Sequence, residues 1–204
     1  LQPISYINFM HIIKLFLISL IILCNSALAE GSQIKIKTNF GSIFLELYPN
    51  KAPKTVENFL SYAKEGAYTE TIFHRIISGF MIQGGGFDKL MKKRPTKQPI
   101  KNEANNGLKN EIGTIAMART GEPHSATNQF FINVSNNKFL NYTMPNRRGY
   151  GYTVFGKVIH GMNIVNKISK LPTGASKPFK RDVPKKMVII ESISIIDSIP
   201  AEIK

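Results

Sequence analysis

The sequence predicts a mainly β domain, in which eight antiparallel strands close into a barrel that two α-helices cap. Three observations support this prediction. Short segments of alternating apolar and polar residues recur along the chain, separated by long polar stretches, as in antiparallel sheets. Only two segments carry apolar residues at helical spacing. Closure into a barrel is favoured because many short strands would otherwise leave exposed sheet edges.

The first two strands form a hairpin, and a helix follows them. Residues Gln33–Thr38 and Ser42–Tyr48 both alternate, and Asn39-Phe40-Gly41 supplies the turn between them. Pro53 then fits the first turn of a helix, where its missing N–H costs little. The apolar residues that recur at helical spacing after it are Val56, Phe59, Leu60 and Ala63. We expect this helix to end near Gly66.

Six further strands and a second helix complete the domain. The strand-like segments are Thr71–Ile76, Phe80–Gln83, Gly113–Ala118, Gln129–Val134, Thr153–Val158 and Met187–Ile196. After Gly161, a helical run places Ile164, Val165 and Ile168 on one face. Two stretches, 87–108 and 136–151, are long, polar and irregular. Loops of this length in a compact domain tend to carry function, so both are candidates to line a site.

Residues 1–29 do not resemble part of this domain. Met10 opens a segment that leads into an almost purely apolar run, Leu15–Leu23, and Ala27-Leu28-Ala29 offers the small side chains that signal peptidase accepts. We expect translation to start at Met10, cleavage after Ala29, and a periplasmic mature domain of residues 30–204. The apolar run is shorter than the ~20 residues of a spanning helix. An uncleaved N-terminal membrane anchor is the alternative.

The chain is strongly basic, with 27 Lys and Arg against 13 Asp and Glu and a net charge of +14. Such a charge favours polyanions in general. The basic residues are dispersed, however, and lack the interleaved aromatic side chains of single-strand binders. We therefore expect no nucleic-acid partner, whereas anionic envelope surfaces stay open as partners. A monomer is the expected state.

Several catalytic chemistries are excluded by the residues that the mature chain lacks. Its histidines, His74, His124 and His160, have no partner at metal-ligand spacing, so we expect no metal site. The single cysteine, Cys24, precedes the expected cleavage, and no G-x-S-x-G occurs, which argues against a hydrolase. Gly84-Gly85-Gly86 lacks the Lys of a phosphate-binding loop and indicates tight backbone packing. No cofactor is expected.

One run of residues places a cation, two large apolar side chains and an amide on adjacent strands. It reads Phe73-His74-Arg75-Ile76-Ile77-Ser78-Gly79-Phe80-Met81-Ile82-Gln83-Gly84-Gly85, and it resembles the cyclophilin signature. Four more segments resemble the same family in the same order: Gly113–Arg119, Asn128–Asn133, Phe139–Leu140 and Val154–Val158. The resemblance implies a cyclophilin-like barrel and a peptidyl-prolyl cis/trans isomerase of the bacterial exported type. Its partners would be proline-containing unfolded or exported polypeptides.

The resemblance also implies a role for individual residues. Arg75 matches the catalytic arginine of the family. The residues that match its peptide-binding positions are Phe80, Met81, Phe131 and Leu140 for the proline pocket, Gln83, Gln129 and the backbone of Ala118 and Arg119 for hydrogen bonds, and Phe139 and Tyr152 beside the pocket. His74 should point to the opposite face of its strand and serve the structure.

The expected reaction suits an arginine. Rotation about an X–Pro bond faces a barrier of ~18–20 kcal/mol because the amide is resonance-stabilised. In the twisted form the prolyl nitrogen regains a lone pair and accepts a hydrogen bond that it could not accept when planar. A fixed guanidinium can donate that bond, so it stabilises the transition state selectively.

The sequence departs from many eukaryotic cyclophilins at three of these positions. Phe139 stands where they carry tryptophan, Tyr152 where they carry histidine, and Arg119 where an asparagine is frequent. Tyr152 keeps an aromatic body and a polar tip, so substrate binding should survive. A second hypothesis is a non-catalytic module that binds proline segments or acts as a chaperone. The intact Arg75 favours the enzyme.

Overall fold

The computed structural model describes residues 32–199, and the predicted signal peptide lies outside them. These residues form eleven strands, two α-helices and a short 3₁₀ helix. The strands are β1 (Gln33–Thr38), β2 (Gly41–Leu47), β3 (Thr71–Ile72), β4 (Arg75–Ile77), β5 (Met81–Gly84), β6 (Thr114–Met117), β7 (Phe130–Asn133), β8 (Val154–His160), β9 (Thr173–Ser176), β10 (Phe179–Pro184) and β11 (Ile189–Ile196). The helices are α2 (Pro53–Lys64), η2 (Lys138–Leu140) and α3 (Met162–Ser169).

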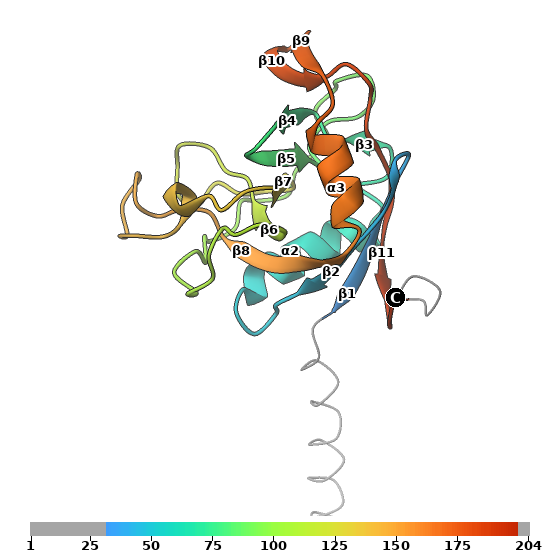
Figure 1. Cartoon of the computed structure of the whole chain (residues 1–204). Helices are drawn as coiled ribbons and strands as arrows, with labels where there is room; N and C mark the ends of the chain where they lie inside the picture. Colours follow the sequence, from blue (N-terminus) through green and yellow to red (C-terminus); the bar gives the residue numbers. More distant parts are fainter. Residues whose placement is uncertain (1–31, 200–204) are drawn as a thin grey trace, which may run out of the picture. The chain divides into compact units, whose positions relative to one another are not determined.

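Nine strands form one antiparallel sheet that curls into a half-barrel (Figure 1). Their order is β3-β11-β1-β2-β8-β6-β7-β5-β4, so the two edge strands are consecutive in the chain. The predicted strand Thr71–Ile76 is wrong as one unit. Ile72 pairs with β11, whereas Arg75 pairs with β5, and the chain changes partner at Phe73 and His74. The mainly β, antiparallel class with two helices is confirmed, although no ladder among the described residues joins β3 to β4 to complete a ring.

Helix α2 begins at Pro53, as its sequence predicts, and a distant carboxylate caps its N-terminus. Glu103 accepts hydrogen bonds from the backbone N–H of Lys54 at 3.2 Å and of Thr55 at 2.9 Å, and from the hydroxyl of Thr55 at 2.7 Å. An anion at this end also interacts favourably with the helix dipole. The loop that carries Glu103 is thereby fixed to the helix.

Both helices direct their apolar faces into one core. Phe59 of α2 packs against Tyr68, Phe130 and Phe155, with ring centroids between 5.2 and 5.5 Å apart. Val165 and Ile168 of α3 are fully buried in the same core. Neither helix within residues 32–199 is long and apolar enough to cross a membrane.

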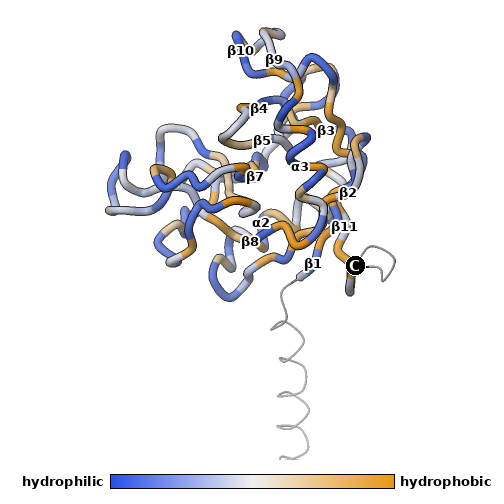
Figure 2. The backbone as a smooth tube through the Cα atoms, viewed as in Figure 1, coloured by the Kyte–Doolittle hydropathy of each residue, from blue (hydrophilic) through white to orange (hydrophobic). Residues whose placement is uncertain are grey.

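Strands β5 to β8 are buried on both faces. Their outer face carries the apolar residues on which the site is built. Ile82, Ile115, Phe130 and Phe155 point into the barrel core, while Met81, Ala116, Phe131 and Val154 form a second apolar cluster on the outer face. Successive side chains of a strand point to opposite faces, so these continuous apolar runs serve two cores. The hydropathy colouring of Figure 2 shows apolar residues along these strands.

One hairpin was not predicted from the sequence. Strands β9 and β10 pair as a separate two-stranded sheet, which Figure 1 shows beside β4. Half of its strand residues are exposed and show no clear alternation, although Val183 and Pro184 are buried. Phe179 attaches it to the barrel by packing on His74 and Phe87 at 5.3 and 5.0 Å.

Candidate active site

Residues on five neighbouring strands form one row across the outer face of the sheet. The register places Arg75 of β4 opposite Gln83 of β5, and Gln83 opposite Phe131 of β7. Phe131 lies opposite Ala116 of β6, which pairs in turn with Val154 of β8. Directly opposed residues have Cβ atoms about 4.5–5.5 Å apart. The register alone therefore brings a cation and an amide beside an apolar floor.

A pocket of about 270 Å³ opens on this row. Met81, Phe131 and Leu140 are almost fully buried and form its floor. The lining residues are Arg75, Phe80, Met81, Gln83, Ala118, Arg119, Phe131, Phe139, Leu140 and Tyr152. A cavity with an apolar floor and polar groups at its edges can hold a small apolar ring and fix its orientation.

The guanidinium of Arg75 lies at the polar side of this pocket and is partly exposed. Its Nη1 donates a hydrogen bond to Oε1 of Gln83 at 3.3 Å. Gln83 in turn donates from Nε2 to Oε1 of Gln129 at 2.9 Å, so the three side chains form a chain of hydrogen bonds. Nε of Arg75 lies 3.5 Å from Oδ2 of Asp182, a residue of the β9–β10 hairpin.

The glycine run Gly84–Gly86, which begins at the last residue of β5, makes room for this chain of hydrogen bonds. A Cβ atom on Gly86 would lie 2.4 Å from Cγ of Gln129, and one on Gly85 would lie 2.9 Å from the rings of Phe130 and Tyr68. Gly85 also has a φ of +84°, which L side chains rarely adopt. The triplet therefore permits close packing, in agreement with the interpretation from the sequence.

Arg119 contributes its side chain as well as its backbone. Nε donates to the carbonyl of Gly151 at 2.8 Å and Nη1 to the carbonyl of Thr120 at 2.9 Å. The guanidinium also lies over the Tyr152 ring, 4.6 Å from its centroid. The sequence interpretation assigned a role to the backbone alone. The side chain joins the loop after β6 to the segment that carries Tyr152.

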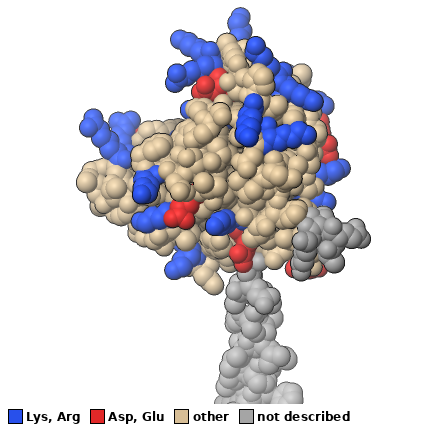
Figure 3. All heavy atoms as spheres, in the orientation of Figure 1, with Lys and Arg blue, Asp and Glu red and all other residues tan. Residues whose placement is uncertain are grey.

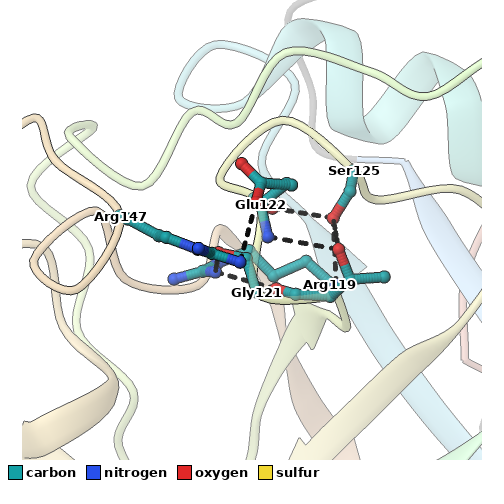
Figure 4. Close-up of polar contacts among 6 residues, drawn as sticks. Arg119, Gly121, Glu122, Ser125 and Arg147 are labelled. Atoms are coloured by element: carbon teal, nitrogen blue, oxygen red, sulfur yellow. Dashed lines mark hydrogen bonds and ion pairs between the residues drawn. The ribbon is translucent and has the colours of Figure 1, made fainter.

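A second contact joins the same two loops farther from the pocket (Figure 4). Arg147 forms an ion pair with Glu122 at 2.9 Å and donates from Nε to the carbonyl of Gly121 at 3.3 Å. Ser125 closes its own loop by donating to the carbonyl of Glu122 at 2.7 Å. Arg147 and Glu122 are largely exposed, so the pair contributes little stability.

Buried asparagines support the loops around the pocket. The side-chain amide of Asn133 on β7 donates to Thr114 Oγ1 at 2.9 Å, and its Oδ1 accepts from Nδ2 of Asn137 at 2.7 Å. Asn137 also donates to the carbonyl of Phe80 at 2.9 Å, and Asn110 donates to that of Leu140 at 3.1 Å. These amides fix Phe80 and Leu140 at the pocket, because buried amides are costly to leave unpaired.

His74 lies on the far side of β4 from the pocket, as alternation predicts. It is 2% exposed, and its ring packs between Phe87 at 4.7 Å and Phe179 at 5.3 Å. Burial lowers the pKa of His74 to about 4, and the neighbouring charge of Arg75 acts in the same direction. The histidine is therefore neutral at pH 7 and packs as an aromatic ring.

The structure brings together ten of the eleven predicted site residues around one pocket. The eleventh, Gln129, is not part of the lining and contacts it by accepting a hydrogen bond from Gln83. Sequence reasoning missed Asp182 and the asparagine network. The asparagines had one signal, since Asn133 ends an otherwise apolar strand; Asp182 had none. Within residues 32–199, no group of three His, Cys, Asp or Glu is placed to hold a metal ion.

The sequence and the fold match known proteins. Residues 33–195 match the family described as cyclophilin type peptidyl-prolyl cis-trans isomerase/CLD. Peptidyl-prolyl cis-trans isomerase B of Escherichia coli (strain K12) is 57% identical over 163 residues, 80% of this chain and 99% of that protein. A peptidyl-prolyl cis-trans isomerase of Acinetobacter baylyi is 54% identical over 165 residues, 81% of this chain and 86% of that protein.

Solved structures agree with the sequence matches. A cyclophilin type peptidyl-prolyl cis-trans isomerase of Cryptosporidium parvum superposes with a TM-score of 0.66 at 32% identity, covering 83% of this chain and 99% of that one. A second structure of that protein, in the presence of the dipeptide Ala-Pro, gives a TM-score of 0.65 at 31% identity.

The half-barrel, its pocket and these matches define an enzyme class, the peptidyl-prolyl cis-trans isomerases. Within that class, the chain belongs to the cyclophilin-type family.

Proposed function

We propose that this isomerase acts on exported, unfolded polypeptides and that Arg75 is its catalytic residue. The observation that carries the assignment is the placement of the guanidinium. It borders a pocket of about 270 Å³ with an apolar floor and is held by Gln83 on one side. The Arg75 side chain is 36% exposed, so it can reach a bound peptide while its stem stays fixed by the sheet.

In this proposal, the pocket holds the proline ring while the preceding residue rotates. Met81, Phe131 and Leu140 contact the ring, and Gln83 and Gln129 with the backbone of Ala118 and Arg119 hold the peptide on either side of it. Holding both sides of the rotating bond is what makes the twist productive. The Cryptosporidium relative studied with Ala-Pro supports a proline-containing ligand.

Arg75 acts when the bond twists. The prolyl nitrogen becomes pyramidal and basic, and an N–H of Arg75 donates a hydrogen bond to it. The planar ground state offers no such acceptor, so the interaction stabilises the transition state and leaves peptide binding unchanged. No bond is broken, and the proton stays on the arginine, because a guanidinium stays protonated in proteins.

The export part of the proposal rests on the sequence of residues 10–29. It is tested by intact-mass measurement of the protein isolated from the periplasmic fraction of its native cells. We expect an N-terminus at Glu30. Retention of the Leu15–Leu23 segment in the membrane fraction would instead support the uncleaved anchor.

The client class is tested by refolding. An exported protein with a slow prolyl folding phase is refolded with and without the domain of residues 30–204. We expect the slow phase to accelerate with the wild type and to return to its uncatalysed rate with Arg75→Ala. Acceleration of short peptides without any effect on the refolding of full polypeptides would contradict this client class.

A further inference from the structure

The β9–β10 hairpin delivers one carboxylate to the active site from a strongly basic segment. Residues 177–186 contain Lys177, Lys180, Arg181, Lys185 and Lys186, and Asp182 is their one acidic residue. Figure 3 shows Lys and Arg side chains gathered at the end of the molecule that this hairpin forms in Figure 1. We propose that Asp182 is a positioning residue that fixes the guanidinium of Arg75 for catalysis. This inference rests on the proposed catalytic role of Arg75.

The contacts of Arg75 divide its five N–H donors into two sets. Nε faces Oδ2 of Asp182 at 3.5 Å, and Nη1 donates to Gln83 at 3.3 Å. These two contacts lie on different edges of the planar group and oppose its rotation about the end of the side chain. Within residues 32–199, these are the only polar contacts of the Arg75 side chain, so both hydrogens of Nη2 and the second hydrogen of Nη1 can be directed at the substrate. Asp182 therefore orients the donors that Arg75 presents.

The backbone of β10 is shaped to place this carboxylate. Phe179 pairs with Ser176 and Val183 pairs with Gly174. Between these two pairs, β10 advances by four residues while β9 advances by two. The extra residues form a bulge that contains Asp182, whose φ is +68°. Bulges redirect side chains beside active sites, and Asp tolerates the left-handed region better than most residues. The local geometry thus serves the contact with Arg75.

Contacts on both sides of the bulge fix the hairpin to the barrel. Phe179 stacks on the ring of His74, the residue immediately before Arg75 in the sequence, with the ring centroids 5.3 Å apart. Val183 is buried. The backbone N–H of Lys185 donates to the carbonyl of Pro172 at 2.8 Å and closes the base of the hairpin. The side chain of Asp182 is 21% exposed, and that of Arg75 is 36% exposed. Partial burial reduces solvent screening of the pair.

Arg181 competes for the same carboxylate without replacing this role. Its Nε lies 3.6 Å from Oδ2 of Asp182, but its side chain is 85% exposed. An exposed arginine exchanges its partners readily with water, whereas Arg75 is held by its strand and by Gln83. The functional contact of Asp182 is therefore the one with Arg75.

The test replaces Asp182 with Asn, which removes the charge but keeps the shape and the tolerance for positive φ. Exchange spectroscopy on a proline peptide measures turnover, and titration measures peptide affinity. We expect turnover to fall about five- to tenfold with affinity unchanged, and the Arg75 Nε–H resonance to shift. Glu191→Gln is the matched control. Glu191 lies on β11 and forms an ion pair with Lys37 at 2.9 Å, so the change also removes one carboxylate charge from an ion pair. We expect its turnover to stay at the wild-type level.

A double-variant cycle separates positioning from a general structural effect. In an Arg75→Ala background, Asp182→Asn should cause no further loss, because its effect passes through the arginine. Phe179→Leu, which loosens the hairpin without altering either charged group, should lower turnover about twofold. Unchanged turnover in Asp182→Asn, or an equal loss in the Arg75→Ala background, would overturn the proposal. Failure of the proposed function would differ, since Arg75→Ala would then itself retain normal turnover.

Discussion

The pocket has two walls of different construction. The strand wall consists of Arg75, Met81, Gln83 and Phe131, whose spacing is set by the hydrogen-bonded register of β4, β5 and β7. The loop wall consists of Arg119, Phe139, Leu140 and Tyr152, which stand on irregular segments and on η2. Long-range side-chain contacts, such as Arg119 with the Gly151 carbonyl, hold the loop wall. Regular backbone pairing fixes one wall, and individual side chains fix the other.

This difference assigns different tasks to the walls. A transition-state hydrogen bond depends steeply on geometry, so its donor belongs on the wall with the smaller positional freedom. Recognition of varied sequences around a proline tolerates adjustment, and loops provide it. We therefore expect changes to the polar residues of the strand wall to alter turnover, and changes to its apolar floor to weaken the binding of the proline ring. Changes in the loop wall should alter substrate affinity.

The largest effect is expected for Arg75→Ala. A charged hydrogen bond that forms only in the transition state contributes about 2–3 kcal/mol, which corresponds to about two decades in rate. Catalytic efficiency should fall about 100-fold, measured by exchange spectroscopy, while peptide affinity stays the same. Arg75→Lys should recover little, because a flexible ammonium lacks the fixed fork. Near-normal turnover in Arg75→Ala would remove the distinction between the walls.

The packing behind the strand wall should respond to pH through His74. Its pKa is about 4 in the folded protein and about 6.5 when exposed, so the unfolded state binds the proton first as pH falls. Stability should therefore be complete above pH 6.5 and decline toward pH 4, by about 2 kcal/mol at pH 5. Urea unfolding at pH 7 and pH 5 measures this loss.

The matched variants are His74→Phe, which should abolish this part of the pH dependence, and His160→Gln, which changes an exposed histidine and should preserve it. An equal loss of stability at pH 5 in wild type and His74→Phe would show that other groups cause it.

A smaller effect is expected for Phe131→Leu, which shortens the floor of the strand wall but keeps it apolar. Loss of ring contacts with the bound proline should weaken peptide affinity about fivefold, or ~1 kcal/mol. Phe44→Leu is the control, since Phe44 is buried on β2 and packs on His160 at 5.8 Å, outside the pocket. It should lower stability and leave affinity unchanged. The reverse pattern would place the proline elsewhere.

The smallest effect is expected for Arg119→Lys in the loop wall. Lysine keeps the charge but cannot hold the Gly151 and Thr120 carbonyls and stack on Tyr152 at once. KM should rise about two- to threefold with kcat unchanged, in steady-state measurements over a range of peptide concentrations. Arg148→Lys makes the same change at an exposed position of the loop that precedes Tyr152, and it should alter neither constant. A selective fall in kcat would show that the loop wall also acts on the transition state.

The sequence predicts well the elements whose order is local. Alternation in β1 and β2 and the helical spacing after Pro53 and Gly161 are each recorded in a short segment, and the structure confirms them. The family resemblance supplies the pocket residues, and the register of β4 to β8 explains why they meet. The continuous apolar run Phe130–Ile132 already indicates a strand covered on both faces.

The β9–β10 hairpin and its role lie beyond such reasoning. Its strands are short and half of their residues are exposed, and their position depends on Phe179 packing against His74 and Phe87, far away in the sequence. The contact of Asp182 with Arg75 has the same origin. From the sequence alone, an isolated aspartate among lysines and arginines is expected to lie on the solvated surface. Only the tertiary structure shows its contact with Arg75. Contacts of this kind have no periodicity for a sequence pattern to record.

The exposed ring of Phe139 makes the enzyme convenient for optical measurements. The chain contains no tryptophan, and Phe139 is 74% exposed at the mouth of the pocket, 5.4 Å from Phe80. A Phe139→Trp variant would carry a single indole at the mouth of the pocket, where an arriving peptide displaces water. This indole could be excited selectively at wavelengths longer than those that tyrosine absorbs. Its emission would shift to shorter wavelength on binding, so occupancy could be followed in real time without a label on enzyme or peptide.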